Sequence, residues 1–132
     1  MNNIKFRVWD KEENKMISGD SFAFEEYVPL NDLFHNNSKQ FIFMQYTGAY
    51  DIYGKDIYEG DIIRSDRGRN IYIGVVTWFE TGWYIYTELT SIKKDGTKHK
   101  YYDYISLKPR YSNCVNKVLG NKFENPELLE VK

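Results

Sequence analysis

Ile71-Tyr-Ile-Gly-Val-Val-Thr-Trp-Phe79 and Trp83-Tyr-Ile-Tyr-Thr-Glu-Leu89 are two runs of β-favouring residues that decide the fold. Apolar residues alternate along both runs, and this period of two predicts strands. In the first run Ile71, Ile73, Val75 and Phe79 fall on one side and Tyr72, Val76 and Trp78 on the other. Both faces of this strand are therefore expected to be covered. Glu80-Thr-Gly82 between the runs suits a tight hairpin loop.

The predicted hairpin extends in both directions along the chain. Asp95-Gly96 offers a second hairpin turn that leads into residues 101–105, which completes a three-stranded meander. Upstream, Gly60-Asp-Ile-Ile63 enters a strand before a polar loop, and this succession has the rhythm of an SH3-like barrel. Asn125-Pro-Glu-Leu-Leu129 has an N-cap residue followed by proline, as at a helix start. We expect a mainly β fold: a small SH3-like barrel or pseudobarrel of short antiparallel strands, with a short C-terminal helical turn.

The remaining segments predict shorter elements. Alternation at Ile4, Phe6 and Val8 predicts a strand with one buried face, which ends in a charged turn at residues 10–15. Residues 16–39 have a weak pattern and are expected to form a loop with one helical turn. Residues 41–46 predict a buried strand that ends at Thr47-Gly48, and residues 118–123 predict the last strand. Residues 51–63 are expected to form turns between short extended pieces, with Gly54 and Gly60 at positive φ.

Length and composition predict one domain, residues 1–132, in the cytoplasm. Lys plus Arg is 18 and Asp plus Glu is 19, so the chain has no global attraction to polyanions. The single cysteine, Cys114, excludes an intrachain disulfide and suits a reducing compartment. No run of residues has the pattern of a signal peptide or the length of a membrane span.

Three segments, taken together, resemble the YopX-like proteins. They are residues 5–11, the run 44–48 continuing through 54–63, and residues 120–129. The residues of the central segment that carry the resemblance are Gln45, Tyr46, Thr47, Gly48, Tyr58, Glu59, Gly60 and Asp61. The resemblance implies a small, mainly β protein carried by phages or prophages of Gram-positive bacteria, with no established activity. It assigns no catalytic residue.

No set of residues in the sequence predicts an active site. The carboxylates of Asp51, Asp56, Glu59 and Asp61 could hold a divalent cation, but acids among glycines more commonly accept hydrogen bonds in turns. A Cys–His nucleophilic pair would require His35 or His99 to lie beside Cys114, and nothing in the sequence brings them together. Cys114 is expected to be a semi-buried apolar residue. Phosphate-binding glycine loops and the Gly-x-Ser-x-Gly elbow do not occur. We therefore expect no cofactor, no metal and no catalysis, and we rank a metal-dependent enzyme last.

A basic, tyrosine-rich hairpin is the strongest candidate contact surface. Its members are Lys93, Lys94, Lys98, Lys100, Tyr101, Tyr102, Tyr104, Lys108 and Arg110, and the segment 93–110 has a net charge near +4. Arg64, Arg67 and Arg69 add a second basic loop. Bases can stack on tyrosines while cations hold phosphates, so nucleic acid is a possible partner. The alternative is that the lysines protect an exposed strand edge from pairing.

An acidic segment, residues 10–32, has a net charge near −5 and opposes the basic one. Two such regions can associate head to tail between copies, which makes a self-assembling structural protein the second hypothesis. The first hypothesis is a non-catalytic binding module for a host or phage macromolecule, with a protein partner favoured. Nucleic-acid binding through residues 93–110 is the third.

Overall fold

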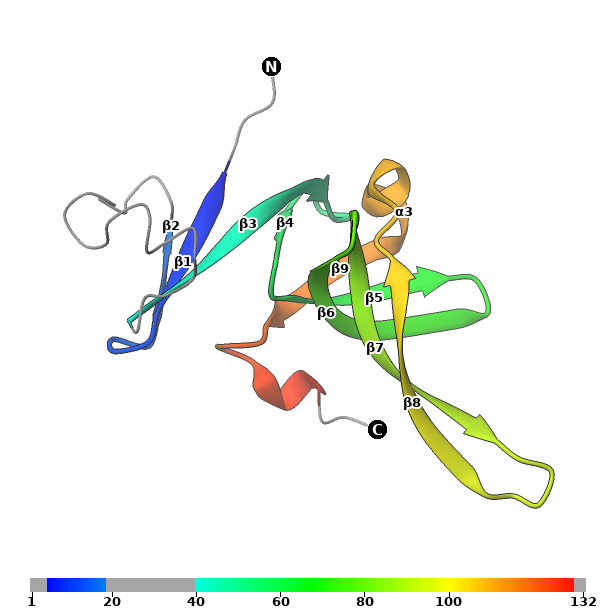
Figure 1. Cartoon of the computed structure of the whole chain (residues 1–132). Coiled ribbons are helices and arrows are strands. Elements are labelled where there is room, and N and C mark those ends of the chain that lie inside the picture. Colours follow the sequence, from blue (N-terminus) through cyan, green and yellow to red (C-terminus); the bar gives the residue numbers. More distant parts are fainter. Residues whose placement is uncertain (1–4, 19–39, 130–132) are drawn as a thin grey trace. The chain divides into compact units, whose positions relative to one another are not determined.

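The computed structural model describes residues 5–18 and 40–129, which fall into two compact units, Met1–Tyr46 and Thr47–Lys132. Almost all regular structure within them is antiparallel β-sheet (Figure 1). The mainly β prediction is therefore confirmed, as is the short helical turn near the C-terminus, η3 (Pro126–Leu129). In the described ranges, no helix is long and apolar enough to cross a membrane.

The first unit is a small sheet in which β1 (Phe6–Asp10) lies between β2 (Lys15–Ser18) and β3 (Phe41–Tyr50). Val8 and Phe41 form its buried centre, with Ile17 and Phe43 packed against them. The expectation of a loop from residue 16 was wrong for residues 16–18, which form β2. Ile17 lies opposite Val8 and packs against this buried residue. The rest of that expected loop, residues 19–39, lies outside the described residues, together with His35 and most of the acidic segment.

β3 continues past Thr47-Gly48, where the sequence placed its end, and pairs with β4 (Asp56–Tyr58). The Thr47 hydroxyl donates to the Ile57 carbonyl at 2.8 Å and accepts the Ala49 N–H at 3.1 Å. These bonds extend the strand and place Ala49 in the core. The turns expected between residues 51 and 63 are present, with Gly54 at φ 82° and Gly60 at φ 89°.

The second unit contains a five-stranded antiparallel sheet that curls into a half-barrel (Figure 1). Its strands are β5 (Asp61–Arg67), β6 (Asn70–Phe79), β7 (Gly82–Ile92), β8 (Lys98–Ser106) and β9 (Asn116–Asn121), in the spatial order β8-β7-β6-β5-β9. The predicted meander and both predicted hairpin turns are confirmed. The sequence did not predict η2 (Pro109–Tyr111) and α3 (Ser112–Val115), which connect β8 to β9.

The core of the second unit lies against one face of this sheet. Its buried members are Ala49, Ile57, Ile63, Val76, Ile85 and Leu107. The register of β5 against β9 shifts between Ile62 and Ile63, where the extra residue is Leu119 of β9, and both isoleucines are fully buried. The opposite face of β6 is not covered as expected, because Ile71 is 51% exposed and Ile73 is 40% exposed. The part of this face that carries Ile71 and Ile73 therefore remains accessible.

Candidate interaction surface

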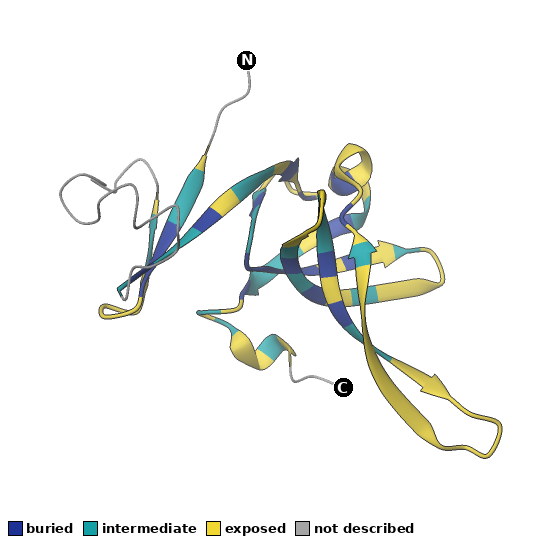
Figure 2. Cartoon of the chain, viewed as in Figure 1, coloured by how far each residue is buried: buried dark blue, intermediate teal, exposed yellow. Residues whose placement is uncertain are grey.

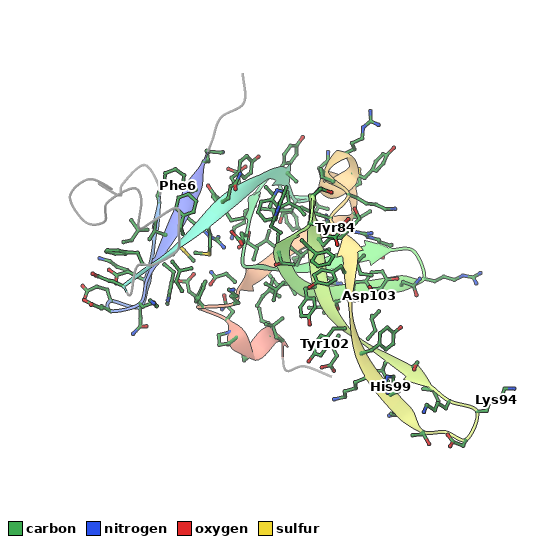
Figure 3. The ribbon with its side chains drawn as sticks, in the orientation of Figure 1. Phe6, Tyr84, Lys94, His99, Tyr102 and Asp103 are labelled. Atoms are coloured by element: carbon green, nitrogen blue, oxygen red, sulfur yellow. The ribbon has the colours of Figure 1, made fainter. Side chains whose placement is uncertain are left out.

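The β7–β8 hairpin is the part of the second unit most exposed to solvent. β8 is an edge strand, and all of its residues except Ile105 are exposed (Figure 2). Figure 3 shows Tyr84 near the base of the hairpin, Tyr102 halfway along it and Lys94 at its tip. Nine consecutive residue pairs join the two strands, from Tyr84 opposite Ser106 to Ile92 opposite Lys98. This regular pairing fixes which side chains share a face.

Five aromatic side chains meet on one face of the hairpin and the neighbouring end of β6. We call this surface the aromatic face; its members are Phe79, Tyr84, Tyr86, Tyr102 and Tyr104. Tyr86 lies directly opposite Tyr104, and the alternation of the strands puts Tyr102 on the same side. The aromatic face is therefore a product of strand register.

The rings of the aromatic face contact one another in a continuous series. Tyr86 stacks on Tyr102 with centroids 5.2 Å apart, and Phe79 stacks on Tyr104 at 4.0 Å. Tyr84 meets Tyr104 edge to face at 6.1 Å. Tyr102 is nevertheless 59% exposed, and Phe79, Tyr86 and Tyr104 are also classed as exposed. A contiguous exposed apolar surface of this kind is characteristic of interaction sites.

A groove of about 480 Å³ adjoins the aromatic face. Tyr86 and Tyr102 line it from the hairpin, Ile71 and Ile73 from β6, and Leu128 and Leu129 from η3. The exposed isoleucines of β6 thus form part of its apolar lining. Its volume is within the range of small-ligand and peptide side-chain pockets.

One carboxylate provides the polar contacts at this surface. Glu88 accepts a hydrogen bond from the Tyr102 hydroxyl at 3.2 Å, and Lys100 Nζ lies 3.6 Å from its other oxygen. The hydrogen bond to Glu88, together with the negative charge of that group, raises the pKa of Tyr102. The phenol, already protonated at neutral pH with an ordinary pKa of 10.0, thus stays a donor over a wider pH range.

The structure divides the predicted basic and aromatic residues between the two faces and the two ends of the hairpin. Lys98 and Lys100 share the face of Tyr102 and Tyr104, because all four occupy even-numbered positions of β8. Tyr101 lies on the other face, where it stacks with His99 at 6.3 Å.

The remaining predicted cations lie at the two ends of the hairpin. Lys93 and Lys94 are in the turn at the tip, and Lys108 and Arg110 follow the opposite end of β8. Arg67, which the sequence placed in a second basic loop, is the last residue of β5 and donates to the Ser106 carbonyl. The cations therefore do not gather on a single surface.

The acidic residues considered for cation binding have structural partners. Asp51 accepts three backbone N–H bonds and Asp61 accepts one from Tyr58 at 2.8 Å. No group of three or more potential metal ligands occurs within residues 5–18 and 40–129. These observations favour the turn role for Asp51 and Asp61.

Cys114 is exposed, so the expectation of a semi-buried residue was wrong. It lies on α3, where the buried residue is Ser112, two positions earlier, and a helix turns by about 200° over two residues. The Cys114 side chain therefore faces away from the buried side of α3.

The segment that carries the family resemblance has structural roles in the fold. The Tyr46 ring lies 4.4 Å from Lys5 Nζ, and Thr47 links β3 to β4. Gly60 adopts a left-handed conformation from which its N–H donates to the Val76 carbonyl at 2.9 Å. Tyr46, Thr47 and Gly60 thus support the strands and the turn in which they lie.

Sequence reasoning missed Phe79, Tyr84 and Tyr86 as members of the surface, and also the groove beside them. The signal was present in the two hairpin turns, because their positions determine which residues of β6, β7 and β8 lie opposite one another. A count outward from Asp95-Gly96 as a two-residue loop would have paired Tyr86 with Ile105. The loop is one residue longer, and the structure pairs Tyr86 with Tyr104. The groove had no comparable signal, since it depends on where η3 packs.

Comparison with known proteins places the chain by fold and by family. It is similar in structure to protein EF1440 from Enterococcus faecalis, known from a crystal structure, with a TM-score of 0.59 and 20% sequence identity. The alignment covers 98% of this chain and 99% of that one, and a likeness at this identity concerns the fold alone. No curated protein matches the sequence. The model of the YopX protein family matches residues 5–130, and the chain therefore belongs to the YopX family.

Proposed function

We propose that this protein is a non-catalytic binding module that recognises another protein through the aromatic face and the adjoining groove. The observation that supports the proposal is the series of stacked rings, of which four are exposed. Tyrosine and other aromatic residues are enriched at protein interfaces, where they provide large contact areas at low entropic cost. The groove supplies a concave site for a partner side chain beside these rings.

We also propose an SH3-like fold, a phage or prophage origin and a cytoplasmic location for this protein. The order of β5 to β9, with η2 preceding the last strand, supports an SH3-like half-barrel. The family resemblance supports a phage or prophage origin in a bacterial host. The single exposed Cys114 supports a reducing compartment, for which the bacterial cytoplasm is our proposal.

Nucleic acid is a weaker candidate for the same surface. Glu88 lies among the groups that would approach phosphates, and it already pairs with Lys100. The other cations are divided between the two ends of a strand that is about 30 Å long. Binding of a protein does not require the cations to lie on one surface, so we favour a protein partner at the aromatic face.

Tyr102→Ser is expected to weaken binding of the protein partner about thirtyfold, as the loss of a central aromatic anchor does. Tyr111→Ser is the matched control, because Tyr111 is 60% exposed against 59% for Tyr102 but lies on η2. Affinity capture from phage-carrying bacteria, with and without nuclease, would identify the partner. Titration of the purified partner against both variants would then measure the effect.

Two results would contradict a protein-binding role at this surface. One is capture that nuclease treatment abolishes, accompanied by a steep fall in affinity with salt, which would indicate phosphate contacts. The other is equal loss of affinity in the two tyrosine variants. Light scattering after size exclusion tests the self-assembly alternative, since the binding module is expected to elute as a monomer in the absence of its partner.

A further inference from the structure

β8 presents one row of backbone groups to solvent. The Leu107 N–H donates to the Trp83 carbonyl at 3.2 Å, and the alternation of an antiparallel pair then directs the odd-numbered residues of β8 toward β7. The even-numbered residues, from Lys98 to Ser106, direct their N–H and C=O groups away from the sheet. An edge of this kind is a template for an additional strand.

Side chains close one end of this edge. The Asp103 carboxylate accepts the outward N–H of Tyr104 at 2.8 Å, and the Arg67 guanidinium donates to the outward carbonyl of Ser106. Among the described residues, none is hydrogen-bonded to the outward backbone groups of Lys98, Lys100 or Tyr102. The open part of the edge therefore extends from Lys98 to Tyr102, and it could pair with about five residues of an extended chain.

The charge around the open part is positive. Lys93, Lys94, Lys98 and Lys100 surround it. The acids beside it are Asp95 in the turn, Asp103 next to Tyr102, and Glu88, which pairs with Lys100, so these seven groups have a net charge near +1. Antiparallel pairing of two copies centred on Lys100 would place this lysine opposite itself, and like charges directly opposite are destabilising. The same lysines that disfavour a second copy would attract carboxylates.

We propose that the edge from Lys98 to Tyr102 binds an extended, acidic segment of a partner protein, which adds to the sheet as a sixth strand beside β8. Main-chain hydrogen bonds would hold the segment and its alternating side chains would be read on two faces. On one face they would meet Tyr102 and Lys100, next to the aromatic face. On the other they would meet Tyr101 and His99. This inference rests on the proposed protein-binding function and names the chemistry of its ligand.

The test begins with a displayed library of random seven-residue peptides selected against the full chain. Acidic sequences are expected to be enriched. Fluorescence anisotropy would then measure the affinity of one selected, labelled peptide. Lys100→Pro is expected to reduce it at least tenfold, because proline removes an outward N–H without removing a bond to β7. Lys100→Ala keeps that N–H and is expected to cost only a few-fold through the lost charge.

A second measurement uses the unmodified protein, in case the proline variant does not fold. Each amide of the selected peptide is methylated in turn, and affinity for the wild-type chain is measured. Loss of affinity at every second position is expected, because only alternate N–H groups of an added strand face β8. Uniform tolerance of methylation, or ligands without acidic residues, would overturn the proposal.

The remaining outcomes separate this inference from the proposed function. If selected peptides tolerate methylation but lose affinity in Tyr86→Ser, the aromatic face binds protein and strand addition is wrong. If the peptides require alternate amides and are indifferent to Tyr86→Ser, the edge binds them without the aromatic face. If the library yields no binder, or the chain pairs with itself instead, strand addition by an acidic segment is wrong, and the aromatic face is judged by the capture experiment with Tyr102→Ser.

Discussion

Gly74→Ala is expected to destabilise the second unit by about 3 kcal/mol, which is the upper part of the range for overpacked interiors. Gly74 lies in β6, buried opposite Thr87. A Cβ at this position would overlap the carbonyl oxygen of Tyr86 and lie 2.9 Å from Cγ2 of Ile85. The overlapping atom belongs to the backbone of β7, so β6 and β7 would have to separate.

The matched control is Gly82→Ala, at the start of β7. A Cβ there would meet only the ring of Tyr84, at 3.4 Å, which is close to ordinary contact. Its expected effect is within about 0.5 kcal/mol of zero, as for most surface substitutions. Denaturant unfolding, followed by tryptophan fluorescence, measures both variants. Similar stabilities for the two would show that β6 and β7 do not approach so closely.

Asp51→Asn is expected to cost about 3 kcal/mol of unfolding free energy, although it changes a single atom's chemistry. One oxygen of Asp51 accepts the N–H groups of Tyr53 and Lys55, each at 2.9 Å, and the other accepts that of Val118 at 3.0 Å. The asparagine amide keeps one of these acceptor oxygens and has an NH₂ group in place of the other. That NH₂ group would face a backbone N–H, so two donors would oppose each other. Charge-assisted bonds to buried donors each contribute about 1.5 to 3 kcal/mol.

The stability of the wild-type chain should also depend on the charge of Asp51. Burial by itself raises the pKa of this carboxyl, but the bonds from Val118, Lys55 and Tyr53 outweigh it, and the pKa falls below its ordinary value of 3.8. The stabilising contribution is therefore complete above the ordinary value and is lost as pH falls through the folded-state pKa.

Unfolding free energies measured from pH 6 to pH 2 would reveal this dependence. The wild type should lose more stability across the acid range than Asp51→Asn does. Asp66→Asn, which removes an exposed carboxylate of β5, serves as the control for the loss of one negative charge. Parallel profiles for wild type and Asp51→Asn would mean that the carboxylate is not held by these three donors.

Local chemistry was sufficient to predict much of the second unit. Asp95-Gly96 and the alternation on either side of it determine a hairpin without reference to the rest of the chain. The segment 109–115 was missed because a 3₁₀ turn followed by a four-residue helix is too short to show helical periodicity. The exposure of Ile71 was missed for a different reason: alternation tells which residues share a face, and tertiary packing decides whether that face is covered.

The candidate surface was predicted in part. Tyr101, Tyr102 and Tyr104 stand close together in the sequence, so composition alone indicated them, but it could not show that Tyr101 faces the other way. Phe79 stacks on Tyr104 across a separation of 25 positions, which only strand register relates. Closure of the edge by Asp103 and Arg67 also depends on tertiary structure.

The pairing of β9 with β5 has a kinetic consequence. β5, β6 and β7 each pair with the next strand along the chain, whereas β9 returns to β5 across a connection of about fifty residues, as in the pair Ser65 and Asn116. Closing so long a loop loses conformational entropy before any contact repays it. The meander should therefore assemble first and β9 should dock last. Contacts made by β9 would then govern how fast the native chain opens far more than how fast it forms.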